Sequence, residues 1–203
     1  MFKFLHDKLM SSTQGWNLSA SDRQEFRDFP SASMAAEMLI APSALMQLRL
    51  AEAQIIMRYM RPKRIPRGTV FIREGEEHET DFMALILDGD VLVDNIVISR
   101  DTPYTVTVLG PGSLHGELGL LDGLPRSASC TAETDLCCAM LTRRGLLKLL
   151  KDDPKVGAKL MMAIAMRIGD RLRDNTRKLK TFASLTKAMQ QEIDSLLQDS
   201  QRV

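Results

Sequence analysis

Residues 114–131 read LHGELGLLDGLPRSASCT and form the most informative stretch of the chain. Gly116 permits backbone angles that other residues avoid, and residues 117–121 can make one helical turn. Such a turn after a glycine presents unpaired N–H groups to an anion. Residues 122–125 then turn the chain back, and Arg126 leads into a strand. One loop therefore offers a carboxylate, backbone donors and a guanidinium.

These three groups match the chemistry of a ribose 3′,5′-cyclic phosphate. The cyclic phosphate carries one negative charge, which suits the planar donor fork of Arg126. The ribose 2′-hydroxyl can donate to Glu117, and a deoxy ligand would leave this carboxylate short of a partner. Ser127 can add a hydroxyl to the phosphate. The alternative is an ordinary ion pair between Glu117 and Arg126 on a surface loop.

The region around this loop reads as short strands separated by turns that contain glycine. Antiparallel sandwiches and barrels have strands of this length and regularity. The predicted strands are residues 69–73, 83–87, 91–93, 96–98, 104–109, 127–131 and 136–141.

Helical patterns flank this region on both sides. The predicted helices are a short one through Phe2, Leu5 and Leu9, then residues 32–41, 43–61, 145–151, 155–180 and 182–197. In the first and the last two of these segments, apolar residues recur at spacings of three and four, which is typical of amphipathic helices. The fold class is therefore α+β, with an antiparallel β-roll of the jelly-roll-like, double-stranded β-helix kind between N- and C-terminal helices.

The loop resembles the phosphate-binding cassette of cyclic nucleotide-binding domains. That family includes regulatory subunits of cyclic AMP-dependent kinase, cyclic nucleotide-gated channels and bacterial catabolite activators. Its pattern is roughly F-G-E-(L/I)-(A/G)-L, a short spacer and P-R-(A/S/T)-A; here the two parts read HGELGL (115–120) and PRSA (125–128). The upstream segments PRGTVFIREG (66–75) and LILDGDV (85–91) are similar to the family as well.

The resemblance covers about residues 45–180 and implies the site residues. Glu117 is expected to bind the ribose hydroxyl and Arg126 the cyclic phosphate. The cassette residues expected to bind the ligand are Gly116, Glu117, Leu118, Arg126, Ser127 and Ala128. The weaker assignments are Val93, Val106 and Thr107 near the sugar and base, His115 beside the cassette, and Arg167, Asp170 and Arg171 on a long helix that caps the base.

Two departures from the family pattern concern the ligand. His115 replaces the bulky apolar residue before the glycine, and either contacts the ligand or packs. Ser127 is intermediate between the alanine common in cyclic AMP sites and the threonine common in cyclic GMP sites. Because the bacterial activators that bind cyclic AMP resemble the serine version, we expect cyclic AMP, with cyclic GMP as the second choice.

The resemblance also implies a regulatory mechanism. Ligand binding is expected to favour one orientation of a hinge at residues 146–155, so that the long helix closes over the base. The apolar stripe of that helix predicts a homodimer, or alternatively packing onto the β-roll. A protein effector is a further possible partner. We divide the chain into an N-terminal helical extension (1–42), the nucleotide-binding domain (43–180) and a last helix (181–203).

Bulk composition excludes several classes of function. The formal net charge of +1 over 203 residues gives no general reason to expect DNA or an anionic membrane as partner. No stretch of about 18 apolar residues is present, so no transmembrane segment is expected. Cys130, Cys137 and Cys138 are an odd number without a C-x-x-C pattern, which favours a reducing cytoplasm and buried, inert thiols.

Neither an enzyme nor a metal or cofactor site is expected. The sequence has no nucleophile–base pair, no metal-ligand spacing and no Walker-type loop. The alternatives to a cyclic AMP sensor are a truncated transcription regulator of the catabolite activator type, a sensor of cyclic di-GMP and an interaction module without ligand. Only 23 residues follow Lys180, which is too few for a helix-turn-helix module.

Overall fold

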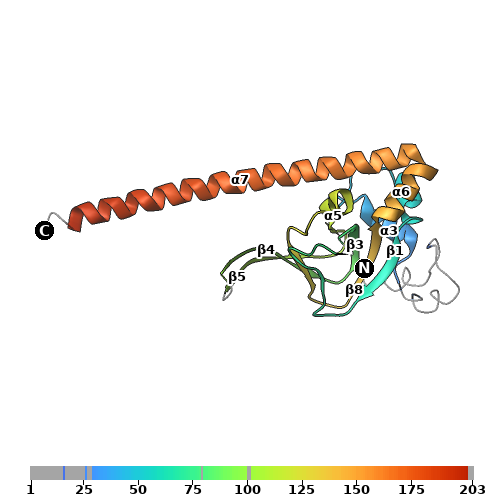
Figure 1. Ribbon diagram of the computed structural model, residues 1–203, viewed down its shortest axis with the longest axis horizontal. Coiled ribbons are helices and arrows are strands. Elements are labelled where there is room, and N and C mark those ends of the chain that lie inside the picture. Colours follow the sequence, from blue (N-terminus) through green and yellow to red (C-terminus); the bar gives the residue numbers. More distant parts are fainter. Residues whose placement is uncertain (1–15, 17–25, 27–28, 79, 100–101, 201–203) are drawn as a thin grey trace, which may run out of the picture. The chain divides into compact units, whose positions relative to one another are not determined.

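The computed structural model describes residues 16, 26, 29–78, 80–99 and 102–200 (Figure 1). The chain divides into two compact units, residues 1–164 and 165–203, and each is described by itself. The first unit contains every described strand, and the second contains most of one long helix. None of the described helices is long and apolar enough to cross a membrane.

Two antiparallel four-stranded sheets form the β-roll of the first unit. One sheet has the order β1-β8-β3-β6 and the other β2-β7-β4-β5. The α+β fold with an antiparallel β-roll is therefore confirmed. The strands are β1 (Arg61–Ile65), β2 (Val70–Ile72), β3 (Phe82–Asp88), β4 (Val91–Ser99), β5 (Thr102–Leu109), β6 (Leu114–His115), β7 (Ser129–Ala132) and β8 (Leu136–Thr142).

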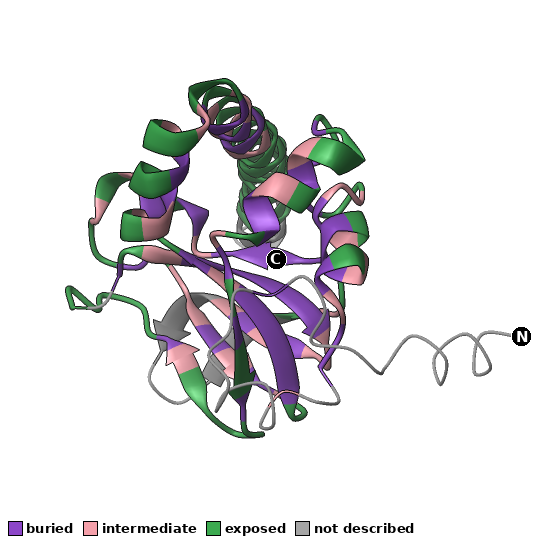
Figure 2. Cartoon of the chain, turned by 90° about the vertical axis from the view of Figure 1, so that its right-hand side faces the viewer, coloured by how far each residue is buried: buried purple, intermediate pink, exposed green. Residues whose placement is uncertain are grey.

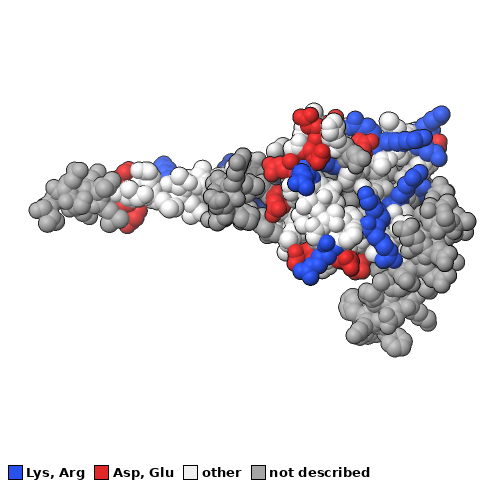
Figure 3. Space-filling model, turned by 60° about the horizontal axis from the view of Figure 1, so that its bottom comes forward, with Lys and Arg blue, Asp and Glu red and all other residues white. Residues whose placement is uncertain are grey.

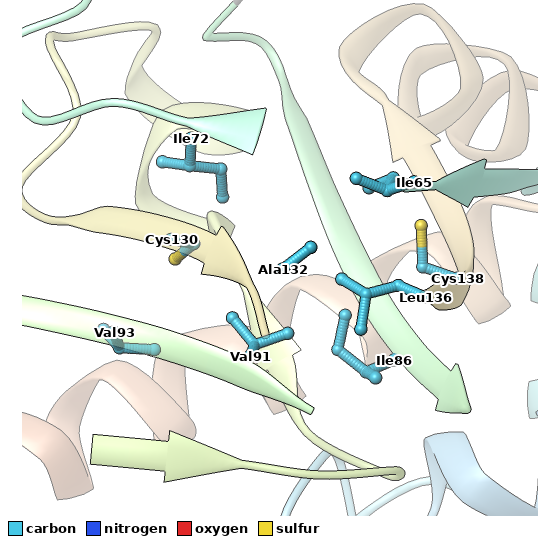
Figure 4. Packing of buried hydrophobic residues seen from close by; sticks show 9 residues of the cluster. All are labelled: Ile65, Ile72, Ile86, Val91, Val93, Cys130, Ala132, Leu136 and Cys138. Carbon is cyan, nitrogen blue, oxygen red and sulfur yellow. The ribbon is translucent and has the colours of Figure 1, made fainter. Parts of the chain in front are cut away.

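The core of the β-roll is an apolar cluster between the two sheets (Figure 4). Alternate residues of a strand face the same side, so Cys130 and Ala132 of β7 are both buried. Strand β3 instead has five consecutive buried residues, because helices cover the outer side of its sheet (Figure 2), and α3 is one of the helices in contact with β3. Burial of this apolar area supplies most of the driving force for folding.

The described helices flank the two sheets. Ser31 caps α3 by accepting a hydrogen bond from the Met34 N–H (3.3 Å), and Thr142 caps α6 in the same way through Gly145 (3.2 Å). The helices are α3 (Ala32–Leu39), α4 (Leu50–Met57), α5 (Glu117–Asp122), α6 (Arg143–Asp152) and α7 (Pro154–Ser200).

Several predicted boundaries were wrong. The helix predicted over residues 43–61 is only α4, because residues 61–65 pair with β8 as strand β1. The strands predicted at 91–93 and 96–98 form one strand, β4. The two helices predicted on either side of Thr181 are the single helix α7, since no glycine or proline interrupts it there. The short helix predicted through Phe2, Leu5 and Leu9 lies outside the described residues.

Candidate functional site

The cassette loop, residues 116–128, starts at a backbone position that requires glycine. Gly116 has φ 80° and lies directly before α5. A Cβ there would lie 2.7 Å from Nη1 of Arg126 and 2.9 Å from the carbonyl oxygen of Phe82. The left-handed backbone and the lack of space both exclude a larger residue. The loop therefore packs closely against the start of β3.

Arg126 holds the two sides of this loop together. Its side chain is buried, with Nη1 donating to the Gly116 carbonyl and Nη2 to the Phe82 carbonyl, both at 3.0 Å. The guanidinium also lies 4.4 Å from the centre of the Phe82 ring, within the range of a cation–π interaction. Burial lowers the pKa of Arg126, but a guanidinium stays protonated at neutral pH. The loop thus carries a fixed positive charge.

Glu117 lies in the first turn of α5 and is only 1% exposed. Burial lowers the pKa of the Arg126 guanidinium, and electrostatic interactions with Cys130, Asp81 and Glu117 each raise it, against this larger effect. The structure therefore buries the carboxylate of Glu117 and the guanidinium of Arg126 in the same loop, which the sequence predicted to carry both. Buried charged residues are rare and are paired or used for binding, so an ordinary surface ion pair does not describe them.

The other predicted cassette residues differ in exposure. Leu118 and Ser127 are exposed, and Ala128 is half-buried against the core cluster. Ser127 follows Arg126 directly in the chain. His115 is 2% exposed, and its Nε2 lies 3.0 Å from Oγ of Ser113. This contact favours packing for His115 over ligand contact.

Strands β4 and β5 carry the residues predicted near the sugar and base. Val93 is buried in the core cluster and is paired with Thr107, which is exposed, and with Cys130. Val106 is paired with Asp94 on the same ladder, and its side chain lies outside the described residues. Val93 therefore reaches the interior near β7, whereas Thr107 faces solvent.

The comparisons with known proteins identify this domain. Residues 62–153 match the family model described as "Cyclic nucleotide-binding domain".

These residues belong to the cyclic nucleotide-binding domain family.

Relatives of the cyclic nucleotide-binding domain span regulators and channels. The CRP-like cAMP-activated global transcriptional regulator of Mycobacterium tuberculosis is 28% identical over 56% of this chain and 49% of that protein. A cyclic nucleotide-gated potassium channel of Rhizobium etli is 32% identical over 64% of this chain and 35% of the channel. The chain thus spans about half the length, or less, of these curated relatives.

Solved structures support the same fold. The crystal structure of a cyclic nucleotide-binding domain from Methylobacillus flagellatus matches with a TM-score of 0.57 and 27% identity, covering 70% of this chain and 81% of that one. This chain and the Methylobacillus flagellatus domain therefore share a fold of antiparallel sheets with flanking helices.

Two residues of the cyclic nucleotide-binding domain escaped sequence reasoning. Phe82 supplies both a ring and a carbonyl to Arg126. Arg143 supports the far end of α5, where Nε donates to the Leu120 carbonyl (3.1 Å) and Nη2 to that of Gly119 (3.3 Å). Both contacts join residues more than 20 positions apart, and no local pattern in the sequence signals them.

The remaining assignments concern the long helix and the thiols. Arg167, Asp170 and Arg171 belong to α7 in the second unit, so their role as a cap over the base stays a prediction. The three cysteines are buried, as expected for inert thiols, and burial raises the pKa of Cys138 to about 12. Among the described residues, no group of His, Cys, Asp and Glu could hold a metal ion.

Proposed function

We propose that the cassette loop binds cyclic AMP and that the chain is a regulatory sensor of the cytoplasm rather than an enzyme. The observation that carries this proposal is the pair of buried charges, Glu117 and Arg126, in one loop of a domain of this family. The Mycobacterium relative, named as cAMP-activated, supports cyclic AMP as the ligand.

In the proposed pose Arg126 binds the cyclic phosphate. A guanidinium has five N–H groups, and two of these are used for the carbonyls of Gly116 and Phe82. The others remain for phosphate oxygens, so the contacts that fix the side chain need not break when the ligand enters. The exposed Ser127 adds its hydroxyl to the phosphate, and Glu117 accepts a hydrogen bond from the ribose 2′-hydroxyl.

Calorimetry of the full chain against a ligand panel tests this function. The panel contains cyclic AMP, cyclic GMP, cyclic di-GMP and 2′-deoxy cyclic AMP. We expect one site per chain, with cyclic AMP bound most tightly. If cyclic GMP or cyclic di-GMP bound most tightly, the proposal of cyclic AMP as the ligand would be wrong. If none of the four binds or raises the melting temperature, the chain is an interaction module without cyclic nucleotide.

We further propose that α7 forms a parallel homodimer. A stripe of positions at alternating spacings of four and three is apolar except at Asn175 and Thr186, which is the heptad pattern of a coiled coil. The ion pairs Arg173–Asp170 (2.8 Å) and Arg177–Asp174 (2.9 Å) lie outside this stripe. The stripe positions are Ile168, Leu172, Asn175, Leu179, Phe182, Thr186, Met189 and Ile193, all exposed except the half-buried Ile168.

Light scattering of the full chain tests the dimer. Leu179 is 67% exposed in the single chain, so Leu179→Glu should leave the fold intact and convert a dimer to a monomer. The matched control is Arg177→Glu, which changes a position outside the stripe and should leave the mass unchanged. A parent chain that is monomeric at all concentrations would reject the dimer.

Within this proposal the ligand acts on the hinge between α6 and α7. Asp153 separates the two helices, and its Oδ1 accepts a hydrogen bond from the Val156 N–H (3.0 Å), which starts α7. A ligand changes this equilibrium only by its different affinity for the two states. A transcription regulator is the second candidate function, favoured by the Mycobacterium relative, and the full reading frame would decide it.

A further inference from the structure

The first unit contains a cavity lined by basic residues, apart from the cassette loop. This basic pocket has a volume of about 380 Å³ and lies where the end of α4, the start of β1, the end of β8 and the first turns of α6 meet. Its volume is in the range of small-molecule sites. The lining residues are Arg58, Tyr59, Met60, Arg61, Met140, Thr142, Arg144, Gly145 and Lys148.

The charge of the basic pocket is strongly one-sided. Four lining residues, Arg58, Arg61, Arg144 and Lys148, are cationic, and none is acidic. The whole chain carries a formal net charge of only +1, so this is a local concentration of charge and not a property of the protein as a whole. Lys and Arg side chains also gather at one side of the face in Figure 3, where Asp and Glu side chains are few.

The four cations of the basic pocket are not paired with any carboxylate that the structure describes, unlike some other basic residues of the first unit. In the first unit Lys159 pairs with Glu52, and Arg67 with Glu133. Within the described part of the chain, no side-chain hydrogen bond or ion pair involves any of the four pocket cations. Several unpaired positive charges around one cavity repel each other and raise the local potential.

Helix α6 adds to this positive field. Its first turn contains no acidic residue and begins with Arg143 and Arg144, although the helix dipole disfavours cations at this end. Arg143 is compensated by the carbonyls of Gly119 and Leu120, whereas Arg144 lines the cavity. A bound anion would offset both the repulsion among the cations and the dipole at this end of α6.

Tyr59 also lines the basic pocket, and it contacts a carboxylate. The Tyr59 hydroxyl donates a hydrogen bond to Oδ2 of Asp152 (3.1 Å). This carboxylate therefore binds the phenol and does not pair with a cation of the basic pocket. Burial raises the pKa of Tyr59, so the phenol stays neutral. A Cβ on Gly145 would lie 2.9 Å from the Tyr59 carbonyl oxygen, which shows how closely α6 packs here.

We infer that the basic pocket binds a small anion with at least two negative charges, of the phosphate or polyphosphate class. Planar guanidinium groups and a lysine ammonium are the usual protein partners of phosphate oxygens. Two sources share this chemistry: inorganic di- or polyphosphate, and the phosphate chain of a nucleotide. The site is separate from the cassette loop, and it is lined by the first turns of α6, the helix that leads to α7.

Calorimetry of the full chain at low salt tests the inference with two probes, inorganic pyrophosphate and ATP. We expect one site per chain. Tighter binding of ATP would indicate that the base contributes, and equal binding would indicate that the phosphates suffice. Arg144→Ala and Lys148→Ala should each weaken binding by about fivefold, and the double variant should abolish it. Circular dichroism checks that both variants fold.

Two controls separate this site from the cassette loop and from general electrostatics. Lys151→Ala removes a cation from the last turn of the same helix, outside the basic pocket, and should leave pyrophosphate binding unchanged. Arg126→Ala should also leave it unchanged, while the double variant should still bind cyclic AMP. Absence of binding, an equal loss in Lys151→Ala, or a loss in Arg126→Ala would each overturn the inference.

Discussion

We propose that Arg126 and Arg144 each bind an anion, yet their surroundings in the structure are opposite. Arg126 is 6% exposed, and its guanidinium is fixed by two carbonyls and the ring of Phe82. Arg144 is exposed in the first turn of α6, and its side chain has no partner in the described part of the chain. The first site is organised before any ligand enters, whereas the second is not.

This difference predicts different kinds of recognition. A fixed guanidinium in a buried loop loses little conformational entropy on binding and fits one geometry. Exposed cations that must be ordered by the ligand depend on charge and accept related anions. The cassette loop should therefore be selective and insensitive to salt, and the basic pocket permissive and sensitive to salt.

The largest effect is expected for Arg126→Ala. Removing the guanidinium should weaken cyclic AMP binding by at least about 100-fold, because the charged cyclic phosphate then has no cation to pair with in the cassette loop. Arg126→Lys should also weaken it strongly, since an ammonium lacks the planar fork. Calorimetry measures both, with Arg144→Ala as the control that should bind like the parent. Parent-like affinity in Arg126→Ala would reject the proposed pose.

Two glycine substitutions compare the packing of the two sites. Gly116→Ala should destabilise the chain by about 2 kcal/mol or more, because its backbone is left-handed and its Cβ would meet Arg126. Gly145→Ala should cost less, about 1 kcal/mol, because its backbone is helical and the gain in helix propensity offsets part of the shift that the close contact with the Tyr59 carbonyl oxygen forces. Urea unfolding measures both. Equal costs would show that the cassette backbone is not under special constraint.

A moderate effect is expected for Glu117→Gln. The parent should prefer cyclic AMP to its 2′-deoxy analogue by about tenfold, because the deoxy ligand leaves the buried carboxylate without its donor. The variant should bind the two ligands nearly equally. Competition binding gives the ratio of the two affinities for each protein. An unchanged ratio in the variant would show that Glu117 does not bind the ribose 2′-hydroxyl.

The smallest effect is expected from salt. Raising the salt concentration from about 50 to 300 mM should weaken pyrophosphate binding by about threefold or more, because exposed charges are screened. Cyclic AMP binding should change less, since Glu117 and Arg126 are buried. Titrations at several salt concentrations give the dependence of each affinity on salt. Equal salt dependence for pyrophosphate and cyclic AMP would contradict the proposed difference between an exposed and a buried binding site.

Local patterns in the sequence were sufficient for most of the fold. Alternating and apolar runs predicted β2, β3, β5, β7 and β8, and α3 lies where residues 32–41 predicted a helix. The pattern failed for β1, whose residues RPKRI alternate poorly and become a strand only through pairing with β8. It also failed for β6, which has only two residues. Pairing with a distant strand decides such elements, and no short window contains it.

The candidate site shows the same division. Gly116, Glu117 and Arg126 lie within 11 consecutive residues, so the sequence alone contains their motif. The structure buries the side chains of Glu117 and Arg126 in this one loop. That Phe82 supports Arg126 from 44 positions away was not legible. Neither was the basic pocket, whose cations come from residues 58–61 and 144–148.

The sequence by itself determined the chemistry of the cassette loop and the alternation that builds the β-roll, because both depend on residues close together in the chain. Only the tertiary structure decided how Arg126 is held, that β1 closes a sheet, and that four cations surround one cavity. These depend on contacts between distant segments, which form when apolar surface is buried and bring side chains together whatever their separation along the chain.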